Sequence, residues 1–101
     1  MEKELDQKLE KYFALTGKAL KKIKINSKAT INVERAAQDF LDMAQRYYED
    51  AKHFEKKGDK LTAFAALNYA HGWLDAGARL GIFDVQGDSA LFTVDETWQQ
   101  S

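Results

Sequence analysis

An apolar seam through the middle of the chain constrains the fold more than any other feature of the sequence. Seven apolar residues follow one another at alternating steps of four and three positions. They are Val33, Ala37, Phe40, Ala44, Tyr47, Ala51 and Phe54. This spacing places all seven on one face of an α-helix and is typical of antiparallel or bundle packing. We therefore expect a helix over about residues 30–57 that packs along its length against other helices.

Two further helices are expected on either side of this one. Apolar residues recur at steps of three and four from Leu5 to Ile23, which predicts an amphipathic helix over about residues 3–24. Residues 60–80 carry apolar or small side chains on nearly all sides, which is typical of a buried helix. The sequence thus predicts three helices that are long relative to a chain of 101 residues.

The breaks between these helices carry recognisable capping signals. Gly58 suits a left-handed helix end, and Asp59 suits the N-cap of the helix that follows. Asn26 and Ser27 indicate the earlier break, and we expect Ser27 or Thr30 to cap the second helix.

These elements predict an all-α fold, an antiparallel three-helix bundle that forms a single domain over residues 1–101. Two short apolar clusters follow the third helix, and we expect residues 82–94 to form a partly extended tail packed on that helix. Residues 95–101 are expected to be loose. The tail and self-association are the two candidates for covering the rest of the apolar third helix.

The composition excludes several classes of protein. The chain has no cysteine, so it has no disulfide, thiol nucleophile or thiolate metal site. The residues after Met1 are mainly charged, unlike a secretory signal, and no apolar run approaches the roughly 20 residues of a membrane helix. We therefore expect a cytoplasmic protein that does not associate with membranes.

Positive charge gathers near the end of the first predicted helix. Residues 1–28 hold eight lysines against four acids. The cluster consists of Lys18, Lys21, Lys22, Lys24 and Lys28. It could contact the phosphates of RNA, DNA or anionic lipid, or it could be a solvated face opposite the acidic tail. Because the cluster has no arginine and no interleaved aromatic residue, nucleic-acid binding is the less favoured interpretation.

Three polar residues interrupt the apolar third helix. Asn68, His71 and Asp75 lie at positions i, i+3 and i+7, on one stripe. One interpretation is a ligand or proton-transfer site in which Asp75 orients His71. The other is a hydrogen-bonded network that fixes helix register, in which His71 bonds to Asp75 or to the second helix. His53, the other histidine, would lie about 12 Å from His71 along an antiparallel hairpin, so we expect no metal site. We expect no cofactor and no catalytic residue either.

Large aromatic residues on the second and third helices form the candidate interaction surface. They are Tyr47, Tyr48, Tyr69 and Trp73, and the last two lie beside the small residues Gly72, Ala76 and Gly77. Such a surface suits docking of another helix, although packing within the chain would use the same residues. The favoured hypothesis is a non-catalytic module that binds a protein partner or a second copy of itself, as a homodimer or other homo-oligomer.

Several stretches of the chain resemble a known family. They are residues 47–54, 57–59 and 63–81, followed by Phe83-Asp84-Val85 and Leu91-Phe92-Thr93-Val94. This pattern is similar to an archaeal family known as domain of unknown function 357. The resemblance implies a compact helical-bundle domain of archaeal origin to which the tail belongs. It implies no reaction, ligand or catalytic residue.

Overall fold

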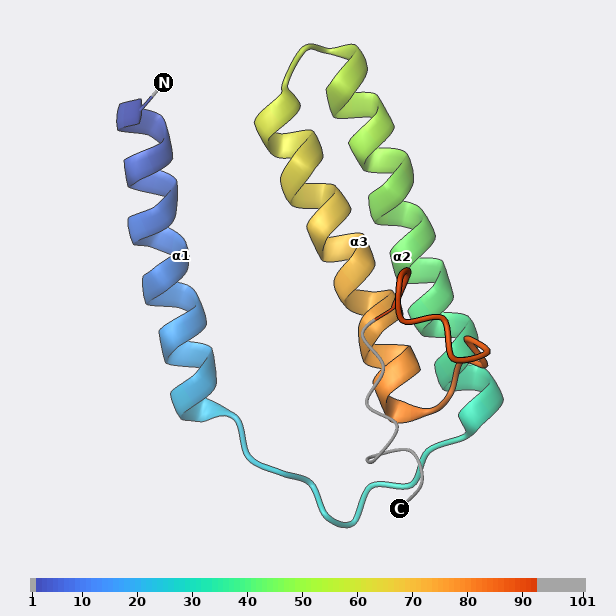
Figure 1. Ribbon diagram of the computed structural model, residues 1–101. Helices are drawn as coiled ribbons and strands as arrows, with labels where there is room; N and C mark the ends of the chain where they lie inside the picture. Colours follow the sequence, from blue (N-terminus) through green and yellow to red (C-terminus); the bar gives the residue numbers. More distant parts are fainter. Residues whose placement is uncertain (1, 93–101) are drawn as a thin grey trace. The chain divides into compact units, whose positions relative to one another are not determined.

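The computed structural model describes residues 2–92, and every regular element in this part of the chain is a helix. The helices are α1 (Glu2–Lys22), α2 (Val33–Lys56) and α3 (Lys60–Leu80), shown in Figure 1. No strand occurs among residues 2–92. The predicted all-α class and the three helices are therefore confirmed. Within the same range, no helix is long and apolar enough to cross a membrane.

The chain divides into two units, Met1–Thr30 and Ile31–Ser101. The first unit consists of α1 and the segment that follows it. Within this unit α1 is amphipathic and buries none of its side chains, and the Phe13 side chain is 77% exposed. No residue from 2 to 30 is buried, and the buried residues of the described part of the chain all belong to the second unit.

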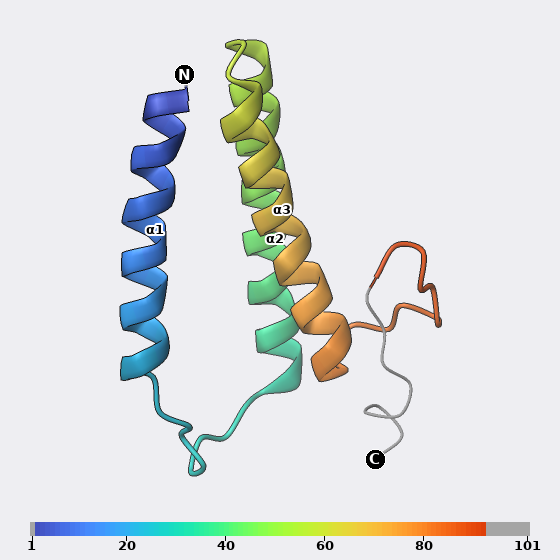
Figure 2. The ribbon, with the colours of Figure 1, turned by 60° about the vertical axis from the view of Figure 1, so that its left-hand side comes forward.

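The second unit is built on an antiparallel hairpin of α2 and α3. The two helices lie side by side in both views of the ribbon, joined by a tight turn (Figures 1 and 2). Gly58 in this turn has a φ of 83°, a left-handed conformation that glycine adopts without strain. The side chain of Asp59 caps α3 by accepting a hydrogen bond of 3.1 Å from the backbone N–H of Thr62. Both predictions for this turn are confirmed.

The predicted cap of α2 is wrong. Neither Ser27 nor Thr30 begins the helix; Asn32 does, and its side chain accepts a 3.0 Å hydrogen bond from the backbone N–H of Arg35. The upstream residues are held in a local turn instead, because the Asn26 side chain accepts a hydrogen bond from the backbone N–H of Lys28. Such local bonds compete with helix formation, so α2 starts three residues later than predicted.

The seam between α2 and α3 is made of small residues. Its buried members recur every seven positions, which brings them onto one face of each helix. They are Ala44 and Ala51 in α2, and Ala63, Ala70 and Gly77 in α3. Ala78 is also buried, and no large side chain among residues 2–92 is fully buried. Small side chains allow two backbones to approach closely, so large side chains flank the seam instead of filling it.

This arrangement corrects the prediction of a third helix buried on all sides. In the hairpin unit α3 buries only small residues, and its large side chains are half-buried or exposed. The exposed ones are Leu61, Phe64, Leu67, Tyr69 and Leu80. Residues 60–80 therefore form a helix whose apolar surface is larger than the area that α2 covers.

The segment after α3 turns back alongside the hairpin. Gly81 ends the helix with a φ of 86°, and the backbone N–H of Ile82 bonds to the Gly77 carbonyl at 3.0 Å. The ring of Phe83 then covers Gly77, and the chain returns as far as His71, which contacts the Leu91 carbonyl. Residues 82–92 thus pack on α3 as predicted, in turns rather than in a strand. The rest of the predicted tail, residues 93–101, lies outside the described residues.

Candidate interaction surfaces

Four aromatic rings form a row across one side of the hairpin. Phe40 and Tyr47 come from α2, and Tyr69 and Trp73 come from α3. The ring centroids of Phe40 and Trp73 lie 5.0 Å apart, and those of Tyr47 and Tyr69 lie 4.4 Å apart, both edge to face. A third contact of 6.5 Å joins Tyr69 to Trp73. We call this row of four rings the aromatic face.

The helical register explains why these four rings meet. Phe40 and Tyr47 are seven positions apart on α2, and Tyr69 and Trp73 are four apart on α3, so each pair lies on one side of its helix. The antiparallel direction then pairs Phe40 with Trp73 and Tyr47 with Tyr69. Tyr69 is the most open of the four, with 54% of its surface exposed, while the other three are half-buried.

The predicted interaction residues do not all lie on this face. Tyr47, Tyr69 and Trp73 are brought together as expected, but Tyr48 lines a groove with Leu41 and His71. Successive helical residues point about 100° apart, which separates Tyr48 from Tyr47. Phe40 belongs to the predicted seam and not to the predicted interaction residues, although it lies seven positions from Tyr47 and so on the same side of α2.

The groove that Tyr48 lines runs between α2 and α3 and has a volume of about 510 Å³. We call it the interhelical groove. Its apolar floor consists of Leu41, Ala44, Leu67, Ala70 and Leu74. Gln45, Glu49, Asn68 and His71 contribute polar groups to its lining. The sequence pattern did not reveal this groove, because it depends on which residues of the two helices face each other.

The predicted polar stripe of α3 borders this groove. The His71 Nε2–H donates a hydrogen bond of 2.7 Å to the backbone carbonyl of Leu91, and the same nitrogen lies 3.6 Å from Oδ1 of Asp75. The ring of Phe92 stacks on the imidazole. Because a carbonyl only accepts, Nε2 carries the proton in this arrangement. The imidazole therefore holds the C-terminal segment against α3, with Asp75 as its neighbour one turn along. Asn68 reaches the groove.

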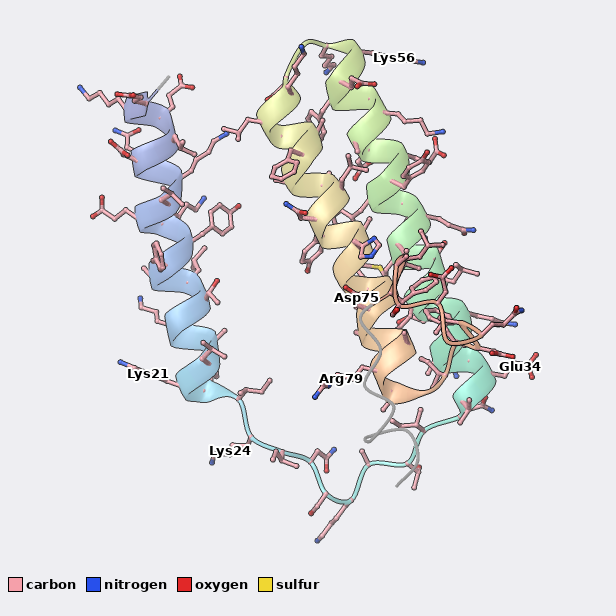
Figure 3. All side chains as sticks on the ribbon, in the orientation of Figure 1. Lys21, Lys24, Glu34, Lys56, Asp75 and Arg79 are labelled. Carbon is pink, nitrogen blue, oxygen red and sulfur yellow. The ribbon has the colours of Figure 1, made fainter. Side chains whose placement is uncertain are left out.

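The lysine cluster lies in the first unit. Lys18, Lys21 and Lys22 belong to the last two turns of α1, and Lys24 and Lys28 follow in the connecting segment (Figure 3). All five are exposed, and no ion pair joins any of them to another residue within residues 2–30.

No group of three or more His, Cys, Asp or Glu side chains able to hold a metal occurs in residues 2–92. His53 is exposed on α2, and its ring contacts that of Phe54, with centroids 5.8 Å apart.

Comparison with known proteins gives one finding. No curated protein and no solved structure matches the chain. Residues 11–83 match the family model described as "Protein of unknown function (DUF357)", and this match includes most of α1, all of α2 and α3, and Phe83. Because the match covers well over half of the 101 residues, the chain belongs to the DUF357 family.

Proposed function

We propose that the protein is a non-catalytic, cytoplasmic interaction module that binds a protein partner, or a second copy of itself, through the aromatic face. One observation carries this proposal. A row of four edge-to-face rings crosses a hairpin in which α2 and α3 bury only alanine and glycine residues.

The chemistry of the face supports this role. Tyrosine and tryptophan are enriched among the residues that dominate binding energy at protein interfaces. Their rings offer large apolar area with few rotatable bonds, and the mutual contacts of Phe40 with Trp73 and of Tyr47 with Tyr69 restrict them further. A partner that covers Tyr69 would remove a ring that is now 54% exposed from water.

Affinity capture from native extract tests the proposal. The tagged full-length protein is compared with Tyr69→Ser and with the control Phe64→Ser, which removes an aromatic ring that is 62% exposed and points about 140° away around α3. We expect a discrete protein that survives nuclease treatment, is lost with Tyr69→Ser and is kept with Phe64→Ser. Light scattering of the purified protein tests whether the partner is a second copy of the chain. In that case the protein forms a dimer that Tyr69→Ser weakens and Phe64→Ser does not.

Two results would contradict the proposal. One is capture that Tyr69→Ser leaves unchanged. The other is a purified protein that stays at the monomer mass of 11.5 kDa at high concentration while the extract supplies no partner.

The second candidate function is nucleic-acid binding through the lysine cluster. The observation in its favour is that these five exposed lysines form no ion pair within their own unit. This function predicts an affinity that falls steeply with salt concentration. It also predicts that reversing the charges of Lys21, Lys22 and Lys24 abolishes binding to RNA or DNA. Binding that survives this triple substitution would exclude the cluster as the contact surface.

A further inference from the structure

A second hollow adjoins the interhelical groove at the C-terminal segment. Leu41 and Leu74 line the groove and also this second hollow of about 430 Å³, whose other lining residues all belong to the segment after α3. In that second hollow Phe83 and Phe92 supply apolar side chains. We call the two adjoining hollows together the furrow. Residues after α3 line one half of it, and no residue of segment 82–92 lines the other half, which we call the open half.

The charged residues that line this furrow are all acidic. They are Glu49 in the open half, and Asp84 and Asp88 in the half beneath the segment. No lysine or arginine lines either half. Lys52 lies above the Tyr48 ring and pairs with Glu49 at 3.1 Å, which balances the charge at that end. The net negative charge is therefore at the end formed by the C-terminal segment.

The two acids at this end are held in place by the backbone. Oδ1 of Asp84 accepts a hydrogen bond from the N–H of Gln86, and Oδ1 of Asp88 accepts from the N–H groups of Ala90 and Leu91. Each carboxylate is exposed, and its second oxygen can still accept from a cation. A basic side chain from outside thus has two fixed carboxylates to meet.

The open half has the length of two helical turns. It extends from Leu41 to Glu49 along α2, eight positions, and from Leu67 to Leu74 along α3, seven positions. At a rise of 1.5 Å per residue this is roughly 10–12 Å. Apolar residues at positions i, i+4 and i+7 of a docked helix span the same length, as in other complexes in which a helix lies in an apolar groove.

We propose that the furrow binds a cationic amphipathic helix of a partner protein. Its apolar side chains lie on the leucine and alanine floor, and its lysine or arginine residues lie beside Asp84 and Asp88. This inference does not depend on the proposed function, because it uses a surface lined by none of the four rings of the aromatic face.

The test measures binding of a fluorescently labelled peptide to the full-length protein by anisotropy. The probe is an amphipathic helix of about 18 leucine and lysine residues, and the comparison peptide has glutamate in place of every lysine. We expect saturable binding of the lysine peptide only. Leu67→Ser should weaken it by about tenfold, because one of the three leucines that line the groove is lost.

Matched variants separate the furrow from a general apolar surface. Leu61→Ser removes a leucine of similar exposure, 47% against 43% for Leu67, from outside the furrow, and should leave the affinity unchanged. Asp84→Asn with Asp88→Asn keeps the Oδ1 acceptors but removes the charges. This double variant should weaken binding severalfold and reduce its dependence on salt.

Four results of the peptide titrations would overturn the inference. Two concern the peptides: equal binding of the glutamate peptide, and no saturable binding up to about 1 mM peptide. The other two concern the variants: equal effects of Leu61→Ser and Leu67→Ser, and loss of binding with Tyr69→Ser alone. Amide chemical-shift changes in the unsubstituted protein give a readout that does not depend on the folding of any variant. They should centre on Leu41, Tyr48 and Leu74, and changes centred on Trp73 would also overturn the inference.

Discussion

Gly77 and Gly72 lie on the same helix, and the same substitution should have opposite effects on them. A Cβ at Gly77 would overlap the Cδ2 and Cε2 atoms of Phe83, whereas a Cβ at Gly72 would meet no atom within 4 Å. Alanine is favoured over glycine inside a helix by about 1 kcal/mol. Gly72→Ala should therefore stabilise the protein by about that amount.

For Gly77→Ala the same gain is opposed by the displacement of Phe83. The backbone nitrogen of Phe83 lies 3.4 Å from the Gly77 carbonyl oxygen, which keeps the Cα of Phe83 close to Gly77, so the ring makes room only by rotating away from its place on α3. Overpacking of this kind costs about 1–3 kcal/mol. Taking the middle of that range, Gly77→Ala should destabilise the protein by about 1 kcal/mol, and the two variants should differ by about 2 kcal/mol.

Urea unfolding followed by circular dichroism measures this difference. For a denaturant dependence of about 1 kcal/mol per molar, the midpoints of the two variants should lie roughly 2 M apart. The double variant Gly77→Ala with Phe83→Ala should lose the steric cost, which appears as a coupling energy in a double-mutant cycle. A Gly77→Ala protein as stable as Gly72→Ala would refute the close contact between Phe83 and α3.

Three further predictions concern the cap, the seam and the C-terminal segment. Asp59→Ala removes the side-chain acceptor at the start of α3 and should lower the free energy of unfolding by about 1 kcal/mol, measured in the same urea assay. Ala70→Leu forces a large side chain into the buried seam and should cost about 1–3 kcal/mol, while Ala65→Leu at an exposed position of α3 should be close to neutral. His71→Ala removes the hydrogen bond to the Leu91 carbonyl and should speed hydrogen exchange in residues 82–92 without changing exchange in α2. Unchanged exchange in that segment would show that the imidazole does not hold it.

The helix boundaries were predictable to the extent that local capping chemistry sets them. The bounds of α3 match the predicted residues 60–80, because Asp59 and Gly81 mark both ends. The start of α2 differs from the predicted residue 30, because Asn32 caps the helix instead of Ser27 or Thr30. Local signals of this kind act over a few residues, so they locate the ends of helices but not the contacts between helices.

The candidate surfaces were predictable only in part. The seven-residue spacing that brings Tyr47 and Phe40 to one side of α2 is visible in the sequence, whereas the pairing of Phe40 with Trp73 depends on the register of the hairpin. The same holds for the interhelical groove, where Leu41 of α2 meets Leu74 of α3. Small residues in the seam determine how closely α2 and α3 approach. This distance in turn determines which side chains meet on the aromatic face and in the interhelical groove.

Site-specific photocrosslinking tests the central claim, binding through the aromatic face, most directly. The photoreactive residue p-benzoylphenylalanine replaces Tyr69 in one full-length protein and Phe64 in another, and each protein is irradiated in native extract. We expect an adduct between the Tyr69-substituted protein and a discrete protein or a second copy, and no such adduct from the Phe64 position. Intermolecular adducts that are equally abundant from both positions, or absent from both, would contradict it.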